Sequence, residues 1–265
     1  METDRQYTTQ LQAGLGMVRE TISLLRLWEP GDTAPTLAQK AVSQGVFSRS
    51  TARRTLNIVR EMFAPRFLCD DARPARALKR LLEATAPPED LSQLFFLHTA
   101  RAQAVFADFV TQIYWPRYMA GASRITRSEA QTFIERALDS GRMRKRWNPS
   151  SIRRVSAYLL GCSADFGLIR GSGRPDWAIT RFAIRPTVAN YLAHDLHFSG
   201  LSDFALTRHP DWRLFGLEPH EVVNQLKNLA HDGHLIIQAA TDLVQITWKY
   251  KSMEDFAHAI SERQI

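Results

Sequence analysis

Apolar side chains recur at helical spacing along most of the chain. The first run predicts a helix over residues 1–30, where the apolar positions are Leu11, Leu15, Val18, Ile22 and Leu25. The longest run predicts a helix from Leu91 to about Tyr118 at the centre of the first core, and Pro116 is expected to kink or end it. Extended segments are few and short. The pattern therefore predicts a mainly α fold: a helical body with helix-turn-helix and winged-helix-like modules and small β-hairpin wings.

Residues 36–63 predict a helix-turn-helix. A short helix stops at Gly45, and a second helix begins at the capping residue Ser48 and runs to about Phe63, where Pro65 ends it. The apolar face of this second helix consists of Leu56, Val59 and Phe63. Its opposite face is predicted to contact DNA through Arg49, Arg53, Arg54, Asn57 and Arg60. The alternative is a solvated basic face on an ordinary helical hairpin.

Residues 126–184 predict the order of a winged helix: helix, basic turn, helix, strand, turn, strand. Thr126-Arg-Ser-Glu129 is a capping box for the first helix, and Asn148-Pro149 is an N-cap pair that opens the second. We place the two strands at Gly167–Arg170 and Thr180–Ile184. The buried stripe of the second helix consists of Ile152, Val155, Leu159 and Cys162.

Positive charge is concentrated in this second module. No acidic residue occurs from Gly141 to Ala164, and the free amides at a helix N-terminus also favour phosphate. The candidate DNA-binding residues in the turn and helix are Arg142, Arg144, Lys145, Arg146, Ser150, Arg153 and Arg154. The candidate wing adds Arg170, Arg174 and Arg181, followed by Arg185. The alternative is that these arginines pair with carboxylates elsewhere in the protein or in a partner.

The last segment predicts a third unit with the order helix, hairpin, helix. A helix begins at Pro219 and ends at Gly233, a hairpin follows, and residues 252–260 form a closing helix. From Leu201 onward there are six Lys or Arg and nine Asp or Glu, a net charge of −3. We therefore expect a partner-binding or structural role for this unit. The predicted domains are 1–122, helical with the helix-turn-helix; 123–200, winged-helix-like; and 201–265, winged-helix-like or partner-binding.

The overall charge points to a polyanionic partner. The 265 residues carry a net charge of +7, and the part before Leu201 holds 28 basic and 18 acidic residues, a net of +10. No apolar stretch reaches the length of a membrane span, and the N-terminus lacks the pattern of a signal peptide. With only Cys69 and Cys162, a disulfide framework is not expected either. The expected location is the cytoplasm, without membrane attachment.

No motif points to catalysis. His194 with His197, and His231 with His234, have the spacing of metal ligands but lack an accompanying Cys or Glu cluster. Gly171-Ser-Gly belongs to neither a phosphate-binding loop nor a dinucleotide fingerprint, and there is no Gly-x-Ser-x-Gly elbow. We expect no enzyme activity, no cofactor and no metal.

Two segments resemble the BrxA family of BREX bacteriophage-exclusion systems. They are Leu15–Phe63, with Phe47-Ser-Arg-Ser-Thr-Ala-Arg-Arg54, and Ile125–Leu192, with Lys145-Arg-Trp-Asn-Pro-Ser-Ser-Ile-Arg-Arg154 and Leu168-Ile-Arg. The resemblance covers about residues 10–200. It implies a helical body with helix-turn-helix and winged-helix-like elements and a part similar to the antiterminator NusB. It also implies double-stranded DNA binding without strong sequence preference, beside a DNA methyltransferase, an alkaline-phosphatase-like protein and large ATPases.

The function predicted from sequence is that of a non-enzymatic double-stranded-DNA-binding component of phage defence. Two alternatives remain open at this point. One is an adaptor whose basic surface docks acidic partner proteins, with DNA binding incidental. The other is a winged-helix transcription regulator, which would act as a dimer on a palindromic operator.

Overall fold

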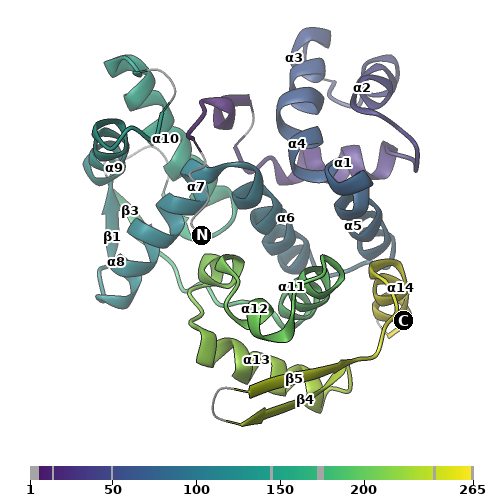
Figure 1. The fold of residues 1–265 in the computed structure, drawn as a ribbon. Helices are drawn as coiled ribbons and strands as arrows, with labels where there is room; N and C mark the ends of the chain where they lie inside the picture. The colour runs from purple at the N-terminus through teal and green to yellow at the C-terminus, as the bar shows by residue number, and fades with distance from the viewer. Residues whose placement is uncertain are drawn as a thin grey trace. The chain divides into compact units, whose positions relative to one another are not determined.

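The computed structural model describes residues 6–13, 15–48, 50–143, 146–171, 176–240 and 243–263. It is mainly helical with a few short antiparallel strands (Figure 1), which confirms the mainly α class that the sequence predicts; the helix-turn-helix and winged-helix assignments stay predictions. The chain divides into two compact units. Unit 1 comprises Met1–Pro74 and Phe95–Phe182, and unit 2 comprises Ala75–Leu94 and Ala183–Ile265. The three-domain division expected from the sequence stays a prediction.

The first part of unit 1 consists of short helical elements that begin at Gln10. Its elements are η1 (Gln10–Ala13), α1 (Val18–Leu27), α2 (Ala34–Ser43), α3 (Ala52–Asn57), η2 (Ile58–Phe63), α4 (Ala64–Phe67) and η3 (Asp70–Ala72). Helix α1 covers only part of the run predicted within residues 1–30, because Met17 adopts a left-handed conformation just before the helix begins. Leu24 and Leu25 bury its apolar face.

Pro65 does not end the helix that begins at α3. The backbone stays helical from α3 through η2 into α4, and η2 is a π-helical turn placed directly before the proline-containing α4. A proline lacks the amide that an α-helix needs, and the wider π turn accommodates this loss. The same arrangement recurs at Pro116, where the π-helical η4 (Val110–Tyr114) precedes α8 (Trp115–Met119).

The predicted central helix is split. Helix α6 (Pro88–Ala102) is followed by a break at Gln103, whose φ of −127° and ψ of 88° are not helical, and then by α7 (Ala104–Phe109). Packing around these helices is aromatic: the Phe96 ring meets those of Phe106, Phe166 and Phe182 edge-on at 5.4–5.8 Å between centroids. This cluster forms a core of unit 1.

The second part of unit 1 combines two helices with a small sheet. The elements are β1 (Arg124–Thr126), α9 (Arg127–Asp139), α10 (Pro149–Asp165), β2 (Ile169–Arg170) and β3 (Asp176–Ile179). The strands are antiparallel in the order β1-β3-β2. Strand β1 was not predicted, and the last strand lies at Asp176–Ile179 rather than at Thr180–Ile184. In so short a sheet, pairing with β1 fixes the strand position, and local sequence does not encode that pairing.

The N-terminal segment is held between these two parts of unit 1. The amide of Tyr7 donates to the carbonyl of Arg142 at 2.7 Å, and Leu11 is fully buried. η1 packs against both η2 and α10. The segment Tyr7–Ala13 therefore connects the helices of the first part to those of the second.

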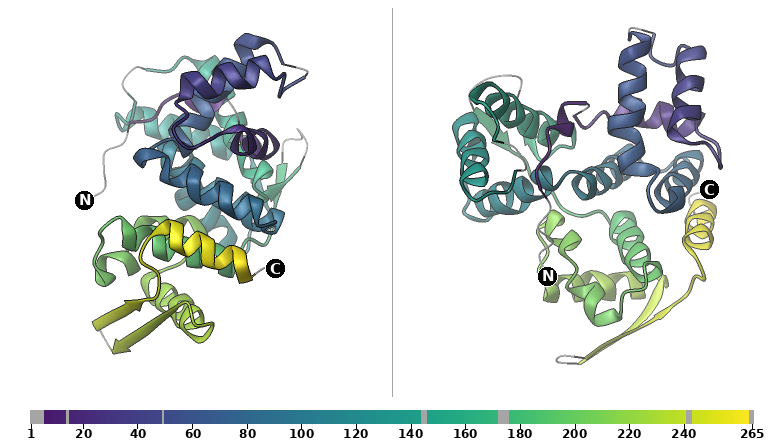
Figure 2. Two further views of the ribbon diagram at one scale, coloured as in Figure 1. Left: turned by 90° about the vertical axis from the view of Figure 1, so that its right-hand side faces the viewer. Right: turned by 45° about the horizontal axis from the view of Figure 1, so that its top comes forward.

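Unit 2 gathers α5 (Arg73–Glu83), from Ala75 onward, and the first turns of α6 with the C-terminal elements. These are α11 (Pro186–Phe198), α12 (Asp203–Thr207), η5 (Pro210–Phe215), α13 (Pro219–His231), β4 (Leu235–Ala240), β5 (Leu243–Trp248) and α14 (Met253–Arg263). Strands β4 and β5 pair as an antiparallel hairpin. The order helix, hairpin, helix predicted for the last segment is confirmed; Figure 2 shows these elements from two further sides.

Within the part of the chain that the structure describes, none of the helices combines the length and hydrophobicity that a membrane span requires. In the same residues, no three His, Cys, Asp or Glu side chains lie together in a way that could hold a metal ion.

Candidate nucleic-acid interface

The turn between α2 and α3 brings the first candidate residues to the surface. Thr33 caps α2 through a reciprocal pair with Thr36, and Gly45, with φ of +59°, lets the chain turn after the helix. The cap of α3 is Thr51, which accepts from the amide of Arg54 at 3.2 Å, and not Ser48 as predicted. Helix α3 therefore begins three residues later than expected.

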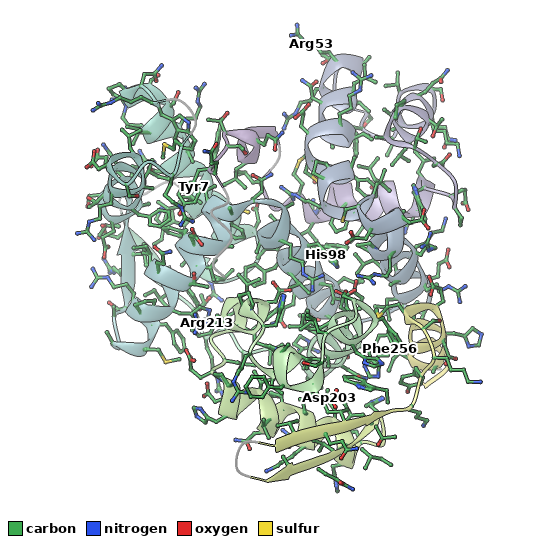
Figure 3. All side chains as sticks on the ribbon, viewed as in Figure 1. Tyr7, Arg53, His98, Asp203, Arg213 and Phe256 are labelled. Atoms are coloured by element: carbon green, nitrogen blue, oxygen red, sulfur yellow. The ribbon has the colours of Figure 1, made fainter. Side chains whose placement is uncertain are left out.

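The two faces of the α3–η2 run differ, and Val59 and Phe63 are buried as predicted, whereas Leu56 is only half-buried. Its buried side chains are Thr55, Ile58, Val59, Met62 and Phe63. All the described candidates on this run are exposed: Arg53, Arg54, Asn57 and Arg60. Figure 3 shows Arg53 pointing outward at the free end of α3. Arg49 lies outside the described residues.

The amino terminus of α10 is built as the sequence predicts. The Asn148 side chain accepts from the amide of Ser151 at 2.8 Å, and Pro149 occupies the first turn. The predicted stripe of Ile152, Val155, Leu159 and Cys162 is buried, which directs the other face outward. The capping box of Thr126 and Glu129 at α9 is also present.

The exposed side of this helix end is basic and polar. Arg146, Ser150, Arg153 and Arg154 are all exposed, and Ser150 donates to the cap oxygen of Asn148 at 2.8 Å. Among the residues that the structure describes, Arg154 reaches only the hydroxyl of Ser151, at 3.4 Å, and pairs with no carboxylate. The first carboxylate in α10 is Asp165, at the opposite end of the helix. Arg144 and Lys145 lie outside the described residues.

The remaining candidate residues lie on or next to strands β2 and β3. Arg170 ends β2 and is exposed, and Arg181, two residues after β3, is exposed as well. Arg174 lies outside the described residues. Arg170 and Arg181 therefore belong to the small sheet and not to the amino terminus of α10.

Two of the arginines predicted to bind DNA form ion pairs with carboxylates of the same chain instead. Arg142 is half-buried, pairs with Asp108 and lies 5.1 Å from the centroid of the Tyr7 ring. In unit 2, Arg185 pairs with Asp90, whose side chain is only 3% exposed. Because each arginine compensates a carboxylate that the fold buries, neither offers an unpaired charge to an external phosphate.

The ends of the two basic helices face one side of unit 1. In Figure 1 the amino termini of α3 and α10 both lie at its upper side, with η1 between the two helices. Sequence reasoning did not find the residues that hold this arrangement. They are Tyr7, Gly16 and the buried Arg66, which carry no motif and act through backbone contacts with distant residues.

Comparisons with known proteins agree with this architecture. The model of the family described as BrxA matches residues 5–195. A crystal structure of an uncharacterized protein from Magnetospirillum magneticum superposes with a TM-score of 0.60 at 13% identity, covering 79% of this chain and 98% of that one. At this identity the likeness concerns the fold alone. No curated protein matches the chain.

Proposed function

The chain belongs to the BrxA family, and from this premise we propose that it is a non-enzymatic component of a BREX system that binds double-stranded DNA. The observation that carries the proposal is the pair of basic helix ends, α3 and α10, on one side of unit 1. Family membership associates the chain with BREX phage defence. The DNA-binding role rests on the side chains themselves.

The topology of the second part of unit 1 supports a winged-helix module. Strand β1 precedes α9 and α10, two strands follow, and the sheet order is β1-β3-β2. In such a module the second helix approaches the duplex and the strand turn lies along the backbone. Helix α10 is then the recognition helix, and the antiparallel pair β2–β3 is the wing. The α2–α3 pair supplies a helix-turn-helix in the same unit.

The contacts that we propose are mainly with phosphate. Exposed guanidinium groups at Arg53, Arg54, Arg146, Arg153 and Arg154 lie at or near helix amino termini, where free amides add positive potential. Phosphate contacts fix position without reading sequence, which agrees with the family's implied lack of strong sequence preference. The other BREX components, namely the methyltransferase, the alkaline-phosphatase-like protein and the ATPases, are proposed partners.

The test is duplex binding measured by fluorescence anisotropy over a range of salt concentrations, with duplexes of unrelated sequence. We expect every duplex to bind, whatever its sequence, with a log–log salt slope of about −0.9 per phosphate contact. Affinity that does not change with salt would contradict the proposal. An adaptor for acidic proteins would instead bind the partner ATPase in a pull-down and show no duplex affinity at physiological salt.

A further inference from the structure

Helix α13 has one buried and one fully polar face. Val222, Leu226 and Leu229 are buried, and the helix packs against α11 and β4 within unit 2. The opposite face carries five exposed side chains at successive turns: His220, Asn224, Lys227, Asn228 and His231. Among the described residues, none of the five side chains is engaged in an ion pair or a hydrogen bond.

The chemistry of this face suits base edges better than phosphates. Asn can form two hydrogen bonds with adenine in the major groove, and Lys can donate to guanine. Histidine offers a further donor or acceptor. The face contains no arginine and no carboxylate, unlike the ends of α3 and α10, where arginine dominates. A helix that presents amides, imidazoles and one ammonium group is equipped to distinguish bases.

The acidic balance of this part of the chain does not extend to that face, because most of its carboxylates are engaged inside unit 2. Asp203 accepts from the amide of Ile246 at 2.8 Å, and Asp211 lies 3.4 Å from His209. Glu218 and Glu221 form the capping box of α13 itself. Glu254 pairs with Arg76, and Asp255 accepts from the amide of Lys251. Most of the acidic side chains therefore act in caps and internal pairs, and the exposed Asp232 lies just beyond the end of α13.

The hairpin that follows α13 adds polar side chains beside it. Strand β4 packs against α13, and Figure 1 shows the helix and the hairpin next to each other. The exposed polar positions are Gln238 on β4 and Gln245 and Thr247 on β5, and the exposed Lys249 follows β5 directly. A helix followed by a hairpin is the arrangement in which winged-helix modules dock on DNA.

We propose that α13 is a base-reading helix, which enters the major groove of a duplex and gives this chain a sequence preference. The inference rests on the proposed function, because α13 acts on the same class of ligand. It also goes beyond that function, since α13 lies outside the residues 5–195 that the family model matches. The partner-binding role that net charge favours for this segment becomes an outcome of the test.

The test is enrichment of bound duplexes from a randomised library with the full-length chain. The chain is expected to enrich a short motif. In the variant Asn224→Ala/Asn228→Ala, the ratio of the affinity for that motif to the affinity for a shuffled duplex should fall at least about tenfold. Each bidentate base contact contributes roughly five- to 150-fold to this ratio. Its affinity for random duplex should stay within about twofold, since phosphate contacts made elsewhere are unchanged.

The matched control is Gln112→Ala/Thr132→Ala, which removes two exposed polar side chains from other elements and should keep the motif preference. If the unmodified chain binds duplexes but enriches no motif, the base-reading role is wrong and the proposed function stands. The role is also wrong if the α13 variant enriches the same motif, or if it loses only a protein partner. If the unmodified chain binds no duplex, both proposals fail.

Discussion

The carboxylate of Asp165 accepts a hydrogen bond from the backbone amide of Gly16, with Oδ2 2.8 Å from the nitrogen. The guanidinium of Arg66 donates to the adjoining carbonyl of Leu15 at 3.0 Å. Arg66 is 2% exposed, and burial lowers its pKa to about 10, so it remains charged at neutral pH. Arg66 belongs to α4, which continues the helical run that begins with α3, and Asp165 belongs to α10. The Leu15–Gly16 backbone therefore connects the two basic helices, α3 and α10.

Replacing Gly16 with Ala is expected to weaken this connection. A Cβ at residue 16 would lie 2.5 Å from the Cβ of Asp165, closer than two carbon atoms can approach. Because a Cβ cannot rotate away, the backbone must shift, and we expect a loss of about 1–3 kcal/mol in the free energy of unfolding. Urea denaturation followed by circular dichroism measures it. Gly161→Ala is the comparison: its Cβ meets the movable Cδ1 of Leu15 at 3.0 Å, so a smaller loss is expected.

Substituting Gln for both Arg153 and Arg154 should make duplex binding less dependent on salt. If each side chain contacts one phosphate, the log–log slope becomes shallower by about 0.9 per residue. The control is Arg117→Gln, which removes a charge that is already paired with Glu129. An equal change of slope in the control would mean that net charge alone, and not this helix end, sets the affinity.

The variant Arg142→Gln should affect stability rather than DNA binding. Its guanidinium pairs with Asp108, which also accepts from the hydroxyl of Tyr7 at 2.6 Å. Removing it leaves a partly buried carboxylate with one donor fewer, at a cost of about 1 kcal/mol after allowance for solvent screening. Arg146→Gln, at an exposed position in the same turn, should show the reverse: unchanged stability and weaker binding. Parallel anisotropy and denaturation measurements separate the two effects.

Glu129 should give a stabilising contribution that is lost in acid. Burial alone would raise the pKa of this carboxyl, but hydrogen bonds from Thr126 and Arg117 outweigh burial and lower it. Because the pKa of Glu129 is lower in the folded than in the unfolded chain, its stabilising contribution is complete at pH values above the ordinary glutamate pKa of about 4.3. It disappears as the pH falls through the folded pKa. Glu129→Gln should therefore be about 1 kcal/mol less stable than the unmodified chain at pH 7. The difference should shrink at pH 3, as urea denaturation at the two pH values would show.

His194 should make unit 2 less stable in mild acid. Its Nδ1 donates to the carbonyl of Asn190 at 2.9 Å, and its ring stacks on that of Phe256 at 4.7 Å. Burial, with smaller contributions from the neighbouring His234 and His197, lowers its pKa to about 4. The unfolded chain takes up this proton near pH 6.5 and the folded chain does not. Stability is therefore full above that pH and falls toward pH 4 by up to about 1.4 kcal/mol per pH unit.

The variant His194→Gln keeps a donor for Asn190 but does not titrate. Thermal unfolding between pH 7 and pH 4.5 should show a smaller loss of stability for this variant than for the unmodified chain. Equal losses would show that other groups cause the acid sensitivity.

Local features of the fold were predictable because they depend on residues close in sequence. The capping box at Thr126, the Asn148-Pro149 helix start and the buried stripe of α10 follow from side-chain and backbone chemistry within one or two turns. The polar face of α3 was predictable for the same reason. By contrast, the sequence placed the α3 cap at Ser48, because it gave no reason to prefer Thr51 among nearby hydroxyl residues.

Pairings across long separations were not predictable in this way. Whether an arginine is exposed or paired depends on which carboxylate the fold brings near, so Arg185 appeared equivalent to Arg181 until Asp90 was placed beside it. The same holds for the carboxylates near α13, whose engagement in caps and pairs is invisible in a count of charges.

The amino-acid sequence by itself determined the helical class, the helix starts at Thr126 and Asn148, and the outward direction of the basic residues on α3 and α10, since these follow from spacing and capping over a few residues. Only the tertiary structure decided which charges remain available and which helix ends share a side. Those outcomes depend on contacts such as that of Gly16 with Asp165, 149 residues apart, and such contacts form only when distant segments pack together.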